Sequence, residues 1–122
     1  MGEAKSLIFV GSSREEIAAL PEDIADDVRT QLQLVQRNRR YVPPTAIPMT
    51  GEFAGIMEIR ERLAGETYRA YYIVRLEDAI YVLYAVHKKS SKGRGMPRPD
   101  QERLRRRFRT AIEASRRHTT GR

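Results

Sequence analysis

Four cationic side chains, spaced so that they could meet on one surface, are the strongest chemical signal in the chain. Arg60 and Arg69 lie in two successive β-like runs, and Lys88 and Lys89 follow directly after a third run in the stretch YVLYAVHKKSSKG. Because side chains alternate between the faces of a strand, adjacent strands could place Arg60 beside Arg69 and bring the lysines close. Like charges this close are costly unless a polyanion neutralises them. The spacing therefore predicts a phosphate-binding site.

Two neighbouring residues could add chemistry to these cations. His87 precedes the lysine pair and can titrate near neutral pH, so it could act as an acid or a base; alternatively, it merely ends the strand. Tyr71 shares a strand side with Arg69 and could stack a nucleotide base, or it could be an ordinary half-exposed aromatic of a sheet. The sequence leaves both alternatives open.

Positive charge is concentrated at one end of the chain. The net charge is +7, but residues 1–86 carry ten Lys and Arg against 13 Asp and Glu, whereas residues 87–122 carry 13 against three. The first part is therefore at −3 and the second at +10, which points to a polyanion as partner. The alternative is a basic surface that serves only solubility, although ordinary surfaces mix both signs.

Composition excludes several classes of protein. The length of 122 residues fits one domain, and the absence of cysteine excludes disulfides, thiolate zinc sites and a cysteine nucleophile. No apolar run approaches the roughly 20 residues of a membrane span, and the N-terminal apolar stretch is too short for a secretory signal. Acidic residues are scattered without metal-ligand spacing. We expect a cytoplasmic protein without a metal or other cofactor.

The first half of the chain predicts one strand and a helical region. Residues 5–10 form a short β-type run that ends in Gly-Ser-Ser. Residues 14–37 have helical periodicity and should form two helices, or one helix kinked at Pro21. Ser13 followed by Glu16 predicts a capping box at the helix start.

The second half predicts an antiparallel meander and a final helix. A long connection at 38–55 contains several prolines and glycines, and three β-like runs follow at 56–62, 67–75 and 79–87. The last helix should begin near Pro99 and turn a stripe inward, made of Leu104, Phe108, Ala111, Ile112 and Ser115. The order β-α-α-β-β-β-α predicts a single α+β domain over residues 1–122, with frayed ends at about 1–4 and 118–122.

Three segments in order, GEFAGIMEIRE, TYRAYYIV and IYVLYAVHKKSSKG, are followed by a proline and a basic helix. Together they resemble the phage-derived, HigB-like branch of the RelE/ParE toxin superfamily, over about residues 5–109. The resemblance implies a RelE-like fold with helices packed on one face of an antiparallel sheet. It also implies the toxin of a type II toxin–antitoxin system that inhibits translation as an mRNA endoribonuclease on the ribosome. A cognate antitoxin, a helix-turn-helix protein encoded adjacently, is the implied partner.

The resemblance assigns residues one by one. Arg60 matches the arginine of the family's EIR segment, Arg69 that of its YR segment, and Lys88 and Lys89 its lysine pair. The family often has an aromatic where this chain has Val86. His87 is not part of the family pattern, so a catalytic role for it rests on this sequence alone.

Cleavage of RNA through its own 2′-hydroxyl needs a base, stabilisation of the phosphorane charge and an acid at the 5′-oxygen. Arginines can hold phosphate with forked hydrogen bonds. A lysine among other cations has a lowered pKa and can transfer protons near neutrality. Such cleavage is metal-independent. We expect further contacts with RNA or the ribosome from a second basic set, which comprises Lys92, Arg94, Arg98, Arg105, Arg106 and Arg109.

Two alternatives remain open at the level of sequence. A ParE-like toxin would inhibit DNA gyrase and would need no nuclease site. A plain basic protein would bind nucleic acid without cutting it. The four cations Arg60, Arg69, Lys88 and Lys89 favour the nuclease, because a gyrase inhibitor needs no phosphate site.

Overall fold

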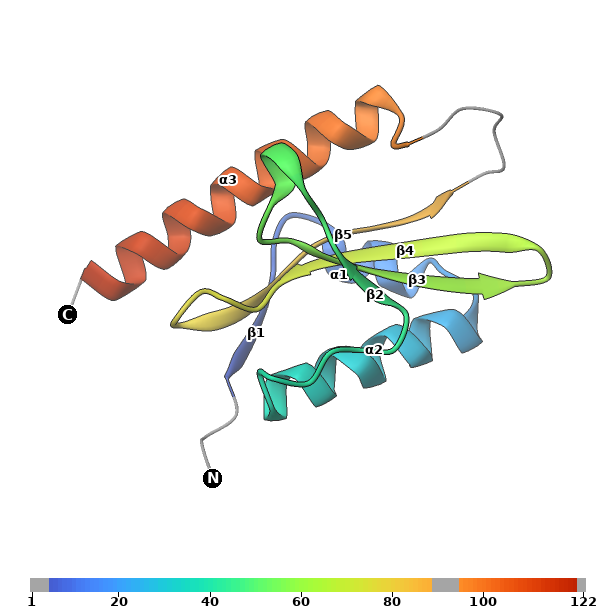
Figure 1. Ribbon diagram of the computed structural model, residues 1–122, viewed down its shortest axis with the longest axis horizontal. Helices are drawn as coiled ribbons and strands as arrows, with labels where there is room; N and C mark the ends of the chain where they lie inside the picture. Colours follow the sequence, from blue (N-terminus) through green and yellow to red (C-terminus); the bar gives the residue numbers. More distant parts are fainter. Residues whose placement is uncertain (1–4, 89–94, 121–122) are drawn as a thin grey trace.

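A computed structural model of the chain describes residues 5–88 and 95–120 (Figure 1). The elements follow one another as β1 (Ser6–Phe9), α1 (Ser13–Ala18), α2 (Glu22–Arg37), β2 (Ala46–Pro48), the 3₁₀ turn η1 (Gly51–Phe53), β3 (Met57–Leu63), β4 (Glu66–Ile73), β5 (Ala79–Lys88) and α3 (Arg98–Thr120). All the predicted elements occur in the predicted order, with β2 and η1 in addition. Helix α3 continues two residues past His118. None of the helices described here is long and apolar enough to cross a membrane.

The five strands form one sheet in the order β1-β5-β4-β3-β2. Strands β2 to β5 are antiparallel, which confirms the predicted meander, whereas β1 pairs with β5 in parallel. Strand β2 was not predicted, because its segment reads as a connection rich in proline. It lies at an edge of the sheet, where a proline such as Pro48 does not interrupt a central ladder.

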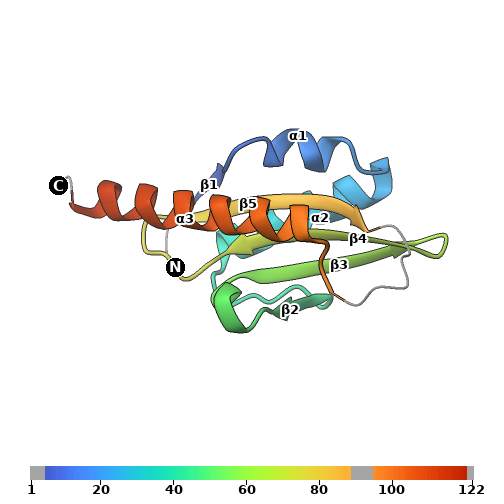
Figure 2. The same cartoon turned by 90° about the horizontal axis from the view of Figure 1, so that it is seen from above.

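Helices cover both faces of the sheet. Helices α1 and α2 bury Ile17, Leu32 and Val35 against one face, together with Ile59 and Tyr72 of the strands. The other core contains Leu104 and Ala111 of α3, packed with Ile56, Tyr81 and Leu83. Figures 1 and 2 show α3 running along β5, with α2 on the opposite side of the sheet in Figure 1. The α+β class is confirmed, and packing on one face describes α1 and α2 but not α3.

The start of α1 corrects one local prediction. Ser13 is not the cap of the helix but its first residue, and its buried hydroxyl donates to the Val82 carbonyl oxygen at 3.1 Å. Ser12 stands at the N-cap position, and its hydroxyl donates to the Glu16 carboxylate at 3.1 Å. The predicted capping box is therefore wrong, because a contact with the sheet takes the Ser13 hydroxyl. Pro21 separates α1 from α2, which settles the helical region as two helices.

Candidate functional site

Strand register brings the two predicted arginines together. Arg60 of β3 lies directly opposite Arg69 of β4, and Glu58 lies opposite Tyr71 two residues away. All four therefore share the face of the sheet on which α3 packs. The sequence-based expectation that Arg60 and Arg69 meet on one face is met.

A buried carboxylate holds these two arginines. Glu58 Oε1 accepts from Arg60 Nε at 2.7 Å, and Glu58 Oε2 accepts from Arg69 Nη1 at 3.1 Å. The side chain of Glu58 is 5% exposed and that of Arg69 13%, whereas 46% of the Arg60 side chain is exposed. Arg69 Nε is buried and has no hydrogen-bond partner among the described residues. An unsatisfied buried donor is uncommon in folded proteins.

These side chains line an open groove of about 270 Å³. One wall comes from the segment around β2, with Ile47, Pro48, Met49 and Thr50, and another from Gly95 and Met96, ahead of α3. Glu58, Arg60 and Arg69 complete the lining. The groove thus joins two partly neutralised guanidinium groups to apolar surface, an arrangement suited to a phosphate with an attached organic group.

Lys88 extends the cationic surface on the same face. It lies opposite Thr67, and Arg69 lies opposite Val86, so Lys88 and Arg69 are diagonal neighbours on one side of the sheet. Three predicted residues, Lys89, Lys92 and Arg94, lie outside the described residues.

His87 lies on the opposite face from the two arginines. It pairs with Tyr68, whose ring it stacks on with 4.6 Å between ring centroids. Its Nε2 lies 2.6 Å from a carboxylate oxygen of Glu66. The sheet therefore separates His87 from Arg60 and Arg69, because strand alternation turns neighbouring residues to opposite sides.

Tyr71 shares the arginine face but is 1% exposed, since α3 covers this part of the sheet. Its ring stacks on that of Tyr84, with 6.1 Å between centroids. Burial and then the Glu58 carboxylate raise the pKa of the Tyr71 phenol well above its usual value. The ring is thus not exposed for stacking on a base, and the phenol stays protonated.

The predicted arginines of α3 differ in their surroundings. Arg98, Arg106 and Arg109 are exposed. Arg105 forms a two-point ion pair with Glu52 of η1 at 2.7 and 2.9 Å. The hydrogen bonds of this pair lower the pKa of Glu52 and raise that of Arg105.

Two residues with definite roles were missed by sequence reasoning. Arg107, within the run RLRRRFRT, is 11% exposed and donates to Glu16 Oε1 at 2.7 Å, the Leu83 carbonyl oxygen at 2.9 Å and Ser12 Oγ at 3.0 Å. Arg107 thereby links α3 to α1 and β5. The sequence could not indicate this role, because nothing in the run distinguishes Arg107 from the neighbouring arginines. Glu58 did carry a signal, because its spacing of two from Arg60 places both on one strand side.

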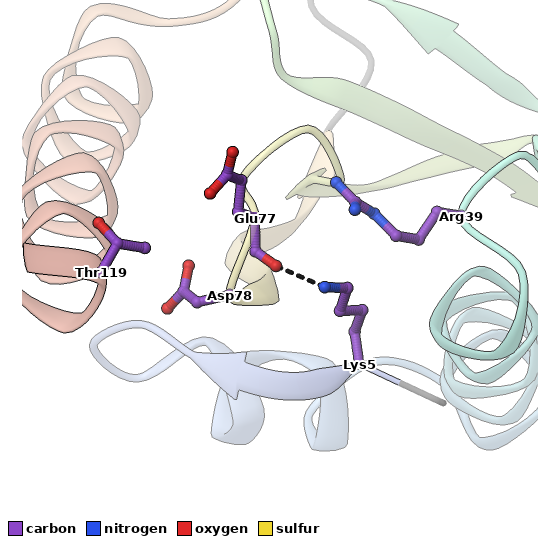
Figure 3. A pocket seen from close by; sticks show the side chains of 5 residues that line it. All are labelled: Lys5, Arg39, Glu77, Asp78 and Thr119. Carbon is purple, nitrogen blue, oxygen red and sulfur yellow. Dashed lines mark hydrogen bonds between the residues drawn. The ribbon is translucent and has the colours of Figure 1, made fainter. Parts of the chain in front are cut away.

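A second hollow of about 470 Å³ lies at the other end of the β4 and β5 strands. Lys5, Arg39, Glu77, Asp78 and Thr119 line it (Figure 3). Lys5 Nζ donates to the Glu77 carbonyl oxygen at 2.6 Å, and Arg39 donates to carbonyl oxygens of the same turn. Its two cations face two acids, so this hollow does not favour a polyanion. Within the part of the chain that the structure describes, no three His, Asp or Glu side chains group closely enough to hold a metal ion.

Comparisons with known proteins agree with the resemblance seen in the sequence. Residues 15–109 match the family model "Phage derived protein Gp49-like (DUF891)". No curated protein matches the chain. A chain from the crystal structure of the toxin–antitoxin complex RelBE2 from Mycobacterium tuberculosis is similar at 21% identity and a TM-score of 0.50, over 74% of this chain and 98% of that chain. That similarity concerns the fold, which is RelE-like. Since the family model spans most of the sequence, the chain belongs to the phage-derived Gp49-like family, as its resemblance to the phage-derived branch of the RelE/ParE superfamily led us to expect.

Proposed function

We propose that the chain is the toxin of a type II toxin–antitoxin system and cleaves mRNA on the ribosome. One observation carries the proposal: Arg60 and Arg69 lie side by side in the lining of an open groove, held by the buried carboxylate of Glu58. Membership of the Gp49-like family and the RelE-like fold support this assignment.

In the proposed reaction, the groove holds the scissile phosphate of an RNA strand. Arg60 and Arg69 bind its oxygens and stabilise the charge of the phosphorane. The phosphate replaces Glu58 as counter-ion of the two arginines in part. The Glu58 carboxylate, bound less tightly by them, then accepts the proton of the 2′-hydroxyl. The 2′-oxygen then attacks phosphorus, and the bond to the 5′-oxygen breaks.

The leaving 5′-oxygen needs a proton, and the proposal assigns it to the lysine pair. Lys88 lies on the arginine face, and Lys89 follows it in sequence. The products are a 2′,3′-cyclic phosphate and a 5′-hydroxyl, formed without a metal ion. No step is assigned to His87 or Tyr71.

Expression of the chain alone in bacteria tests the proposal. Growth should stop, and mapping of RNA 5′ ends should reveal cleavage within translated messages. The variant Lys88→Ala with Lys89→Ala should restore growth and remove the cuts, because it takes away the proposed proton donors and leaves the pairing of Glu58 with Arg60 and Arg69 in place. Arg37→Ala, which removes an exposed charge at the end of α2, should remain toxic.

Other results would favour the alternatives. Growth arrest with intact mRNA and accumulating DNA breaks would indicate a gyrase inhibitor. RNA binding without growth arrest or cleavage would indicate a plain nucleic-acid-binding protein.

The proposal includes an antitoxin as partner, and the RelBE2 structure is likewise a toxin–antitoxin complex. We expect an adjacently encoded helix-turn-helix protein whose acidic or amphipathic segment covers the arginine groove or displaces α3. Co-expression of that neighbour should restore growth. A neighbour of this kind that binds the chain but leaves it toxic would contradict this part of the proposal.

A further inference from the structure

The outer edge of β1 presents backbone groups that no described strand uses. Of the strands that the structure describes, β1 pairs with β5 alone. Val10 N donates toward β5, to the Val82 carbonyl oxygen at 2.9 Å, whereas Lys5 N donates to Gln36 at the end of α2. Because successive amides of a strand point in opposite directions, the N–H groups of Leu7 and Phe9 point outward, away from β5. Such an edge can accept an added strand.

A groove of about 190 Å³ runs beside this edge, between β1 and the helices α1 and α2. Its apolar lining consists of Leu7, Phe9, Ile17 and Leu32. Ile8, on the other side of the strand, is 38% exposed. An added strand would therefore find a slot for an apolar side chain next to its main-chain partners.

Two arginines at the groove define the charge of the occupant. Arg14 lies over the Phe9 ring, with its guanidinium carbon 4.2 Å from the ring centroid, so it stands directly above the apolar slot. Arg29 lines the same groove and pairs only with the exposed Asp26, at 3.3 Å, among the described residues. A second copy of this chain would bring two more arginines to the same place and be repelled. A carboxylate would be attracted.

We propose that this edge binds an extended segment of a partner protein in which acidic and apolar residues alternate. The segment pairs with the outward amides of Leu7 and Phe9, inserts an apolar side chain into the groove, and places carboxylates against Arg14 and Arg29. This surface lies on the helix α1 and α2 side of the sheet, away from the arginine groove. The proposal does not depend on nuclease activity.

Titration with a capped synthetic peptide of alternating Glu and Val tests this site, with amide NMR shifts of the full chain as the readout. Shifts should concentrate at Ser6 to Phe9 and along the groove face of α2. The variant Arg14→Glu with Arg29→Glu should weaken binding by about tenfold or more, since two ion pairs become two repulsions. Arg40→Glu with Arg37→Glu changes the net charge equally at exposed sites off the groove and should bind as the unmodified chain does.

Two control peptides separate the parts of the proposal. Replacing Glu by Lys should abolish binding, and replacing the central Val by Pro should weaken it, because proline cannot continue the ladder. The proposal falls if the peptide shifts only residues of the arginine groove, if the Lys peptide binds equally, or if no binding occurs. A chain that cleaves mRNA but fails to bind the peptide would refute this site and leave the nuclease proposal standing. A chain that binds the peptide but does not cleave mRNA would support this site and refute the nuclease proposal.

Discussion

At the scale of single residues, the Glu58 carboxylate determines whether two arginines can share the groove. Arg60 and Arg69 lie directly opposite each other, where like charges repel. Glu58 binds both and is itself 5% exposed, so each charge is compensated by the others. The site therefore contributes to stability as well as to the proposed chemistry. Arg69→Ala is for this reason a poor test of catalysis, because it would leave a buried carboxylate half paired.

We expect Glu58→Gln to lower the free energy of unfolding by about 3 kcal/mol, because breaking a buried ion pair leaves uncompensated charge. Urea denaturation measures the change. Glu77→Gln removes the same charge from an exposed side chain and should alter stability by no more than about 0.5 kcal/mol. Equal effects of the two substitutions would show that Glu58 does not hold the arginines.

A second carboxylate, Asp78, makes stability dependent on pH. Burial alone would raise the pKa of Asp78, but hydrogen bonds from Ser115 at 2.5 Å and Tyr81 at 2.6 Å outweigh it, and the pKa lies below its usual value. A folded-state pKa below the unfolded one stabilises the fold above about pH 4. This contribution is lost as pH falls through the folded-state pKa.

Ser115→Ala should therefore destabilise the protein by roughly 1–2 kcal/mol at pH 7. The difference from the unmodified protein should narrow as the pH falls below about 4, because protonated Asp78 holds the serine less strongly. Urea denaturation at both pH values measures this. Thr110→Ala, at an exposed position of the same helix, should show no such narrowing. A difference for Ser115→Ala that stays constant with pH would contradict the account.

At the scale of elements, Arg107 links α3 to two other elements of the fold at once. Arg107 joins Glu16 of α1 and the Leu83 carbonyl oxygen of β5. Gly11 leaves room for it: a Cβ atom there would lie 2.8 Å from Arg107 Nε, and the φ of +57° also disfavours a side chain. The turn before α1 is thus shaped around a side chain of the last helix.

Arg107→Ala should lower the free energy of unfolding by about 3 kcal/mol, because it strands the partly buried Glu16 carboxylate. Its neighbour Arg106 is exposed, and Arg106→Ala should change stability by no more than about 0.5 kcal/mol. Thermal or urea unfolding of the two variants gives the comparison. If both variants unfold alike, packing of Leu104 and Ala111, rather than Arg107, attaches the helix.

At the scale of the whole molecule, the concentration of positive charge in residues 87–122 predicts how binding responds to salt. Arg106 and Arg109 are exposed on α3, away from the groove lining. Replacing both with Ala should weaken ribosome or RNA binding and reduce the slope of log affinity against log salt by about 1–2. Cleavage of bound mRNA should remain nearly unchanged. Arg37→Ala on α2 serves as the control, and a slope that α3 substitutions leave unaltered would contradict an electrostatic role for this helix.

Much of the fold follows from periodicity in the sequence. Apolar spacing marks α1, α2 and α3, and short connections mark the meander, because these signals are local. Contacts between distant segments were not accessible in this way. The capping box failed because Ser13 bonds to β5, and β2 was missed because it is a short edge strand next to prolines. The position of α3 on the second face likewise depends on tertiary packing.

For the candidate site too, local patterns were predictable from the sequence and tertiary contacts were not. Strand alternation placed Arg60 and Arg69 on one face, and the register agrees. Alternation also predicts that His87 and Lys88 diverge, yet which of them joins the arginines depends on how β5 aligns with β4. Burial of Tyr71 follows from coverage by α3, which no local pattern indicates.

The position of β5 between β1 and β4 has a consequence for how the chain folds during synthesis. Strand β1 near the N-terminus aligns with β5, from Ser6 beside Ala79 onward, and Glu16 meets Arg107 91 positions later. During synthesis β1 therefore cannot pair until β5 has been made, and Glu16 of α1 cannot bind Arg107 until α3 has been made. Folding can be completed only when residues 5 to 107 have all left the exit tunnel. A protein whose proposed target is the translating ribosome would thus remain inactive while the first hundred or so of its residues are being made.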